Sequence, residues 1–366
     1  MKTIFKLLVL TFISIQINAQ NSSPTINALI DSTITKYGIP SMVVAVIKPD
    51  TCYYGKGGVL RINSDEKVNL KSKYHLGSDS KAIASFVAMT LIEDSLISLD
   101  TKLLELIPEL AKNARVEYKD ICLGDLLSHT ARIQHYTTDE EFNKLPELNG
   151  SISEQRMQFT NFVLTEPAVG KLEYSNAGYV IATLMLERAS GKSFEELLKK
   201  TLTELDLDYF IGFPDKQNHL YPSGHWVEDS ILITLPTTHP YKLMPIMVAA
   251  GDIAMDIIDY SKFIQLHLNG ANGNCKYLSR KGYNDLLEYK KPYALGWANG
   301  VDNNGFKYYG HNGSAGTYYC HNFIFPHNEV AIIIMINSAE DEHKKGINEI
   351  REQVIDLLNE NKLILD

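Results

Sequence analysis

The hydrophobic period changes twice along this chain, and that change constrains the fold more than any single motif does. Near the N-terminus, "SMVVAVIK" and "CYYGKGG" predict two strands of a hairpin. From Ser78 to about Ser190, apolar residues recur three and four apart, as is typical of helices. The last quarter returns to short apolar runs separated by turns, which predict successive strands.

Strands at both ends with helices between them predict a discontinuous α+β fold of two domains. We expect residues 20–75 and 290–366 to form an antiparallel sheet flanked by N- and C-terminal helices. Residues 76–289 would form an inserted, mainly helical domain. Active sites often lie at domain junctions, so the boundary between the two is the expected site.

Further elements are expected at particular segments. A capped helix should end near Gly38, a second should cover "MDIIDYSKFIQLHLNG", and the last should cover roughly "KGINEIREQVIDLLNEN". "YALGWANG" predicts a strand of the C-terminal sheet. Residues 205–245 show no clear period and predict long irregular connections.

The first residues have the order of a secretory signal. Lys2 and Lys6 precede the apolar run from Leu7 to Ile15, and polar residues then lead to Ala19. We therefore expect residues 1–19 to be a signal peptide and the protein to be exported, to the periplasm or outside the cell. That run is too short to span a bilayer, and no later stretch predicts membrane insertion.

Composition limits the classes of molecule that this protein is expected to bind. The chain has 35 Lys and Arg against 44 Asp and Glu, a formal charge of −9, and no basic stripe, so nucleic-acid binding is not expected. Four cysteines, Cys52, Cys122, Cys275 and Cys320, leave disulfides or buried thiols open. The zinc and redox spacings CxxC and HExxH are absent from the sequence, so we expect no metal and no cofactor. The sequence contains no pattern that predicts the oligomeric state.

A serine with a lysine three residues on occurs twice, as Ser64/Lys67 and Ser78/Lys81. The first pair lies among polar turn residues. The second opens an apolar helix, where residues three apart share a face and a partly desolvated lysine can act as a base. The competing interpretation is that Ser78 or Ser80 merely caps the helix.

Two other segments favour an active site over a cap. Tyr174 and Asn176 stand immediately before a predicted helix, where Asn176 as an N-cap is the structural alternative. His311, Gly313 and Ser314 stand at the end of a predicted strand, where the small residues would let a substrate lie against its edge. The structural alternative is that Gly313 and Gly316 only make a hairpin turn.

Taken in order, Ser78–Lys81, Tyr174–Asn176 and His311–Gly313 resemble the SxxK, YxN and HxG/KTG elements of the serine β-lactamase-like family. That family includes class C β-lactamases, D,D-carboxypeptidases, D-aminopeptidases and family VIII esterases. "DLLSHTARI", "AAGDIAMDIIDYSKF", "YALGW" and "GHNGSAGTYYCHNFIFPHNEVAIIIMIN" are similar to further segments of the family. The resemblance covers most of the chain after the signal.

The resemblance implies an acyl-enzyme mechanism without a cofactor. Ser78 would be the nucleophile, and Lys81 and Tyr174 would share its proton. Tyr174 would serve as the general base or pass the proton to the leaving group, and it can do so at neutral pH only if nearby positive charge depresses the pKa of the phenol. Asn176 would bind the substrate amide or Lys81. Backbone N–H groups of Ser78 and Ser314 would form the oxyanion hole, and His311 and Gly313 would line the substrate's third side.

One departure bears on the substrate. His311 replaces the lysine of class C β-lactamases, and histidine is mostly neutral at pH 7. We therefore expect an esterase or D-peptidase, acting on a small-molecule or peptidoglycan-derived ester, peptide or amide, rather than an efficient β-lactamase. The alternative is a low-turnover penicillin-binding or peptidoglycan-sensing module.

Overall fold

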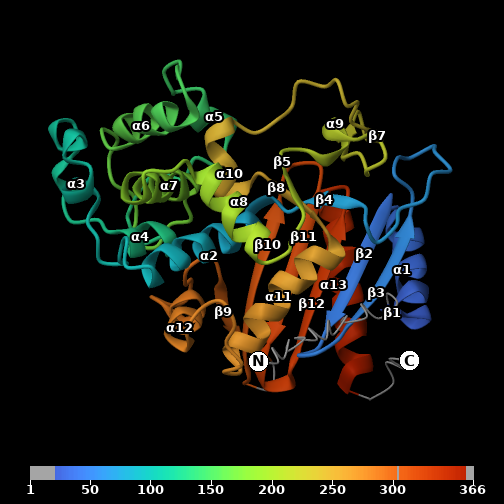
Figure 1. Ribbon diagram of the computed structural model, residues 1–366. Helices are drawn as coiled ribbons and strands as arrows, with labels where there is room; N and C mark the ends of the chain where they lie inside the picture. The colour runs from blue at the N-terminus through green and yellow to red at the C-terminus, as the bar shows by residue number, and fades with distance from the viewer. Residues whose placement is uncertain (1–20, 303–304, 360–366) are drawn as a thin grey trace, which may run out of the picture.

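The computed structural model describes residues 21–302 and 305–359. A seven-stranded sheet in the order β1-β3-β2-β12-β11-β10-β9 forms its centre (Figure 1). Its pairs are antiparallel, except that the two residues of β1 run parallel to β3. Its strands are β1 (Asn21–Ser22), β2 (Ser41–Ile47), β3 (Cys52–Gly58), β9 (Ala298–Val301), β10 (Lys307–Ser314), β11 (Tyr319–Phe325) and β12 (Val330–Ile336).

Two small sheets and a set of helices complete the fold. The small sheets have the orders β4-β8-β5 and β6-β7. Their strands are β4 (Lys73–His75), β5 (Tyr209–Ile211), β6 (His225–Glu228), β7 (Ile231–Thr234) and β8 (Ile253–Asp256). The α-helices are α1 (Pro24–Tyr37), α2 (Ser80–Glu93), α3 (Leu103–Leu106), α4 (Leu123–Leu127), α5 (Asp139–Phe142), α6 (Ile152–Val163), α7 (Asn176–Ser190), α8 (Phe194–Glu204), α9 (Pro214–Gln217), α10 (Val248–Gly251), α11 (Ile257–Ala271), α12 (Arg280–Glu288) and α13 (Asp341–Asn359).

The central sheet is buried on both faces. Helices α1 and α13 cover one face, and α11 lies across the other (Figure 1). Every residue of β2 is therefore buried: Val44 and its alternate neighbours pack toward α1 and α13, whereas Val43 and its neighbours face the larger core on the α11 side. The larger core continues into the helices from α2 to α8.

Most predicted elements are confirmed. Helix α1 begins after Ser23, whose side chain accepts the Ile26 N–H, and ends at Gly38 in the left-handed conformation. The β2–β3 hairpin, the helices after Ser78 and the α11 and α13 helices all form at their expected segments. The antiparallel sheet with flanking terminal helices is the predicted fold. The predicted signal peptide lies outside the described residues.

Two expectations were wrong in detail. The strand predicted over "YALGWANG" begins only at Ala298, because Gly296, at φ +81°, turns the chain against α2; a Cβ on Gly296 would lie 2.7 Å from Ala82 Cα. Residues 205–245 are more regular than expected, since they contain β5, α9 and the β6–β7 hairpin. The division into 20–75, 76–289 and 290–366 stays a prediction, although α11 from the middle range packs on the central sheet.

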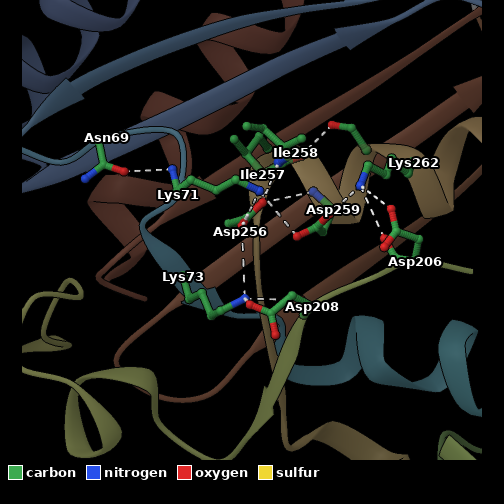
Figure 2. A network of polar contacts seen from close by, with 11 residues as sticks. Asn69, Lys71, Lys73, Asp206, Asp208, Asp256, Ile257, Ile258, Asp259 and Lys262 are labelled. Carbon is green, nitrogen blue, oxygen red and sulfur yellow. Dashed lines mark hydrogen bonds and ion pairs between the residues drawn. The ribbon is translucent and has the colours of Figure 1, made fainter. Parts of the chain in front are cut away.

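A network of charged side chains, in which Lys73 and Asp256 are buried, fixes β4 to the start of α11 (Figure 2). Lys73 is 1% exposed, and its Nζ lies 2.9 Å from Asp208 Oδ2 and 4.0 Å from Asp256 Oδ2. Lys71 reaches the same Asp256 oxygen at 3.2 Å. Asp256 also caps α11 by accepting the N–H groups of Ile258 and Asp259. One carboxylate therefore holds the strand that leads into Ser78.

Replacing Asp256 should cost stability. Asp256→Ala removes the α11 cap and leaves Lys73 with less compensating charge, so we expect a loss of about 3 kcal/mol in the free energy of unfolding. Urea unfolding followed by circular dichroism measures this loss. Asp65→Ala, at an exposed aspartate, is the control. Equal midpoints for the two variants would contradict the role of Asp256.

Candidate active site

Ser78 lies on a 3-10 turn, Gly77–Asp79, between β4 and α2. The turn is held from both sides: Leu76 N–H donates to Ile253 O at 2.8 Å, and Gly77 N–H donates to His75 Nδ1 at 3.0 Å. Ser80 Oγ donates to Gly77 O at 2.7 Å instead of capping the helix, and α2 has no side-chain cap. The interpretation of Ser78 as a helix cap is therefore wrong.

Lys81 follows one turn later and is fully buried. Its Nζ lies 3.4 Å from Ser78 Oγ and 2.7 Å from Asn176 Oδ1, and it also donates to the carbonyl oxygen of Ala250. The last two partners can only accept hydrogen bonds. If the amine is neutral, its two N–H groups donate to Asn176 Oδ1 and Ala250 O. Its lone pair can then accept a hydrogen bond from the Ser78 hydroxyl.

Burial also decides the charge of this lysine. Desolvation lowers the pKa of Lys81 well below its ordinary value, although the Asp79 carboxylate nearby acts in the opposite direction. No carboxylate forms an ion pair with Lys81 within the described residues. The free base is thus present at lower pH than in an exposed lysine, which is what a general base requires.

Tyr174 lies on the loop before α7, next to both groups. Ser78 lies close enough to lower the pKa of the Tyr174 hydroxyl, although burial outweighs this effect, and Lys81 Nζ lies 4.7 Å from the centre of the Tyr174 ring. Burial raises the pKa of Tyr174 well above its usual value. The condition for Tyr174 to serve as the base, a pKa depressed by nearby positive charge, is therefore not met, because desolvation has the larger effect. Tyr174 is a phenol that can pass a proton on, and Lys81 is the better base.

Asn176 is the first residue of α7. Its Oδ1 accepts from Lys81, and its Nδ2 donates to Tyr136 O at 2.9 Å. The N-cap is Ser175, whose Oγ accepts the Gly178 N–H at 3.0 Å, so the capping interpretation of Asn176 was wrong. Ser175 frees the Asn176 amide to orient the base.

Strand β10 closes the third side of the site. A Cβ on Gly313 would lie 1.7 Å from Leu76 O, so only glycine lets the strand lie against the Ser78 turn. A Cβ on Gly77 would lie 2.5 Å from the backbone N of Ser314. The backbone of Ser314 is thereby brought beside the turn that carries Ser78, as two converging oxyanion donors require.

His311, also on β10, is 7% exposed. Its Nε2 lies 2.8 Å from the Tyr293 hydroxyl, and its ring centre lies 6.4 Å from that of Tyr174. The structure thus brings Ser78, Lys81, Tyr174 and Asn176 into direct contact. His311, Gly313 and Ser314 lie around them.

Several residues near the site had no sequence signal. Asp79 is fully buried next to Ser78, and its Oδ1 faces His311 Nδ1 at 3.3 Å. His129 is buried and accepts the Ser175 N–H on Nδ1, and its ring centre lies 4.5 Å from that of Tyr174 in a tilted arrangement. Tyr293 falls within "YALGW", a segment that carried the resemblance but no predicted role.

Cysteines, metal-ligating side chains and long apolar helices were the other features that could mark a functional site. The four cysteines are free thiols. Within the described ranges, no three His, Cys, Asp or Glu side chains gather as a metal site would require. Among the same residues, no helix combines the length and apolar character needed to cross a bilayer.

Comparison with known proteins places the chain in a family. The family model described as "Beta-lactamase" matches residues 26–355. The chain belongs to the beta-lactamase family, and with it to the superfamily of serine hydrolases that contains penicillin-binding proteins and class C β-lactamases.

Individual relatives are distant. Penicillin-binding protein 4 of Amycolatopsis lactamdurans is 23% identical over 336 residues, covering 84% of each chain. The octameric penicillin-binding protein homologue from Pyrococcus abyssi has a TM-score of 0.69 at 19% identity, over 86% of this chain and 73% of its own. The class C beta lactamase from Rhodobacter sphaeroides has a TM-score of 0.70 at 14% identity, over 91% and 100%. The two structures confirm the predicted fold.

The state of Lys81 should be visible in the pH dependence of acylation. The lysine is a base only above its folded-state pKa, which burial lowers below 10.5, so the rate of Ser78 acylation should rise with pH through that lowered value. Lys81→Arg, which keeps its proton, should lose at least about 100-fold in this rate. The control is Lys67→Arg, in the other Ser-x-x-Lys pair. A pH-independent rate in the wild-type protein would contradict this role.

The contact between β10 and the Ser78 turn can be tested with one methyl group. Gly313→Ala should push the strand away from Leu76 and lower kcat/KM by about 100-fold, because small misplacements at a reacting centre cost that much. Gly170→Ala is the control, since its Cβ would meet only the end of the exposed Glu173 side chain. Activity assays on folded protein measure both, and wild-type activity in Gly313→Ala would contradict the packing argument.

Proposed function

We propose that this protein is an exported serine hydrolase that forms an acyl-enzyme on Ser78, with an ester or a D-amino-acid peptide or amide as substrate. The observation that carries the proposal is the arrangement around Lys81. Two oxygen acceptors occupy its N–H groups and direct its remaining position toward Ser78 Oγ.

The chemistry follows from these contacts. Lys81 takes the Ser78 proton as Oγ bonds to the substrate carbonyl carbon. When the bond to the leaving group breaks, Tyr174 gives its proton to the leaving group and receives one from Lys81, so both side chains return to their starting states. Backbone N–H groups of Ser78 and Ser314 stabilise the oxyanion, a feature worth about 100-fold to 1000-fold in rate per donor.

The charges near β10 support an ester or peptide over a lactam. A β-lactam antibiotic carries a carboxylate that needs a fixed positive charge. Here the third element offers His311, which faces the buried Asp79 carboxylate at 3.3 Å, so the negative charge nearby disfavours a second carboxylate.

A second candidate is a penicillin-binding module that is acylated but turns over poorly. The name of the Amycolatopsis lactamdurans relative, penicillin-binding protein 4, favours it. The hydrolase and the penicillin-binding module differ in whether the acyl-enzyme is hydrolysed. Comparing single-turnover and steady-state rates with one activated ester separates them, because steady turnover excludes a stable adduct.

Covalent labelling tests the nucleophile. A fluorophosphonate or an activated ester should modify the wild-type protein on Ser78, and Ser78→Ala should abolish the modification. The matched control is Ser64→Ala, which removes the serine of the other Ser-x-x-Lys pair and should label normally. Intact-mass spectrometry measures the adduct. Labelling that persists in Ser78→Ala would overturn the assignment.

A further inference from the structure

Asp79 is a buried carboxylate that the acylation steps do not use. It is 0% exposed, and its Oδ2 accepts hydrogen bonds from Tyr260 at 3.2 Å and Asn322 at 2.9 Å. Its Oδ1 makes no hydrogen bond among the described residues and faces His311 Nδ1 at 3.3 Å. Two neutral donors therefore fix the carboxylate, and its second oxygen is directed at an imidazole.

The surroundings of His311 determine its tautomer. Nδ1 faces two oxygens, Asn312 O at 2.9 Å and Asp79 Oδ1 at 3.3 Å. Both oxygens can only accept, so Nδ1 carries a proton. In the neutral ring Nε2 is then the acceptor, and the Tyr293 hydroxyl 2.8 Å away is its donor.

Tyr293 completes a chain of carboxylate, imidazole and phenol. Burial raises the pKa of Tyr293 well above its ordinary value, which keeps the hydroxyl protonated and able to donate to His311. Its ring centre lies 6.4 Å from that of Tyr174, in an edge-on arrangement. The chain has the order found in nucleophile triads, with Tyr293 in the place of the group that loses its proton.

We propose that Asp79, His311 and Tyr293 form a second proton relay, which activates the water that hydrolyses the acyl-enzyme. This inference rests on the proposed function, and it assigns turnover rather than a stable adduct to the site. Tyr293 touches the reacting water, whereas Asp79 is a positioning residue that acts through His311.

The proton balance is closed. Water gives a proton to the Tyr293 oxygen as Tyr293 gives its own to His311 Nε2, and the water oxygen bonds to the acyl carbon. The ionised Asp79 stabilises the imidazolium. When the bond between that carbon and Ser78 Oγ breaks, the proton returns from His311 through Tyr293 and the adjacent Tyr174 to Ser78 Oγ. The products are the free acid and the free serine.

Pre-steady-state kinetics with a p-nitrophenyl ester test the relay. Tyr293→Phe keeps the ring but not the hydroxyl, so it should lower kcat by about 100-fold and lower KM in proportion, with kcat/KM nearly unchanged, because only deacylation slows. A burst should appear, and intact-mass spectrometry should find the acyl group on Ser78. Tyr309→Phe, at a tyrosine of β10 that bonds Glu288, is the matched control.

Asp79→Asn tests the positioning residue. It should also accumulate the acyl-enzyme, and the double variant Asp79→Asn/Tyr293→Phe should be no slower than Tyr293→Phe, because groups in one chain are not additive. An unchanged kcat in Tyr293→Phe, or an equal fall in kcat and kcat/KM in a natively folded variant, would overturn the relay alone. A wild-type protein that forms no Ser78 adduct would overturn the proposed function, and the relay with it.

Discussion

The rest of the site depends on the burial of one amine, that of Lys81. A lysine taken fully out of water is costly as a cation unless a carboxylate pairs with it, and here its direct partners are neutral oxygens. The neutral amine is thereby favoured. The amine is carried by α2, and its two oxygen partners belong to α7 and α10, so packing those helices together buries the amine and positions its acceptors at the same time.

Asp79 presents the opposite problem two residues earlier. A buried carboxylate also needs compensation, and Tyr260 on α11 and Asn322 on β11 supply it with hydrogen bonds. Both partners belong to elements that pack on or form the central sheet (Figure 1). Ser78 thus lies between a base held by the helices and a carboxylate held by the sheet. Each side of the fold fixes one ionisable group, an amine that burial favours in its neutral form and a carboxylate held by two hydrogen bonds.

The sequence predicted the parts of this protein that have local signals. Hydrophobic period found the central strands and the long helices, and three short motifs found Ser78, Lys81, Tyr174, Asn176 and His311. The features that the sequence could not predict depend on packing between residues far apart in the chain. No motif assigned Asp79 a role, and the pKa of Tyr174 depends on burial that no motif encodes. The role of Ser175 as the cap of α7 also required geometry.

Acylation alone cannot distinguish a hydrolase from a penicillin-binding module, since both need a nucleophile, a base and an oxyanion hole. The discriminating groups are those that acylation leaves unused. In this chain these groups are polar side chains buried beside Ser78. Their desolvation lowers the stability of the fold and does not assist acylation. A stable acyl adduct gives no reason to place a carboxylate and an imidazole there. Hydrolysis of that adduct does, because the attacking water must lose a proton as it bonds to the acyl carbon.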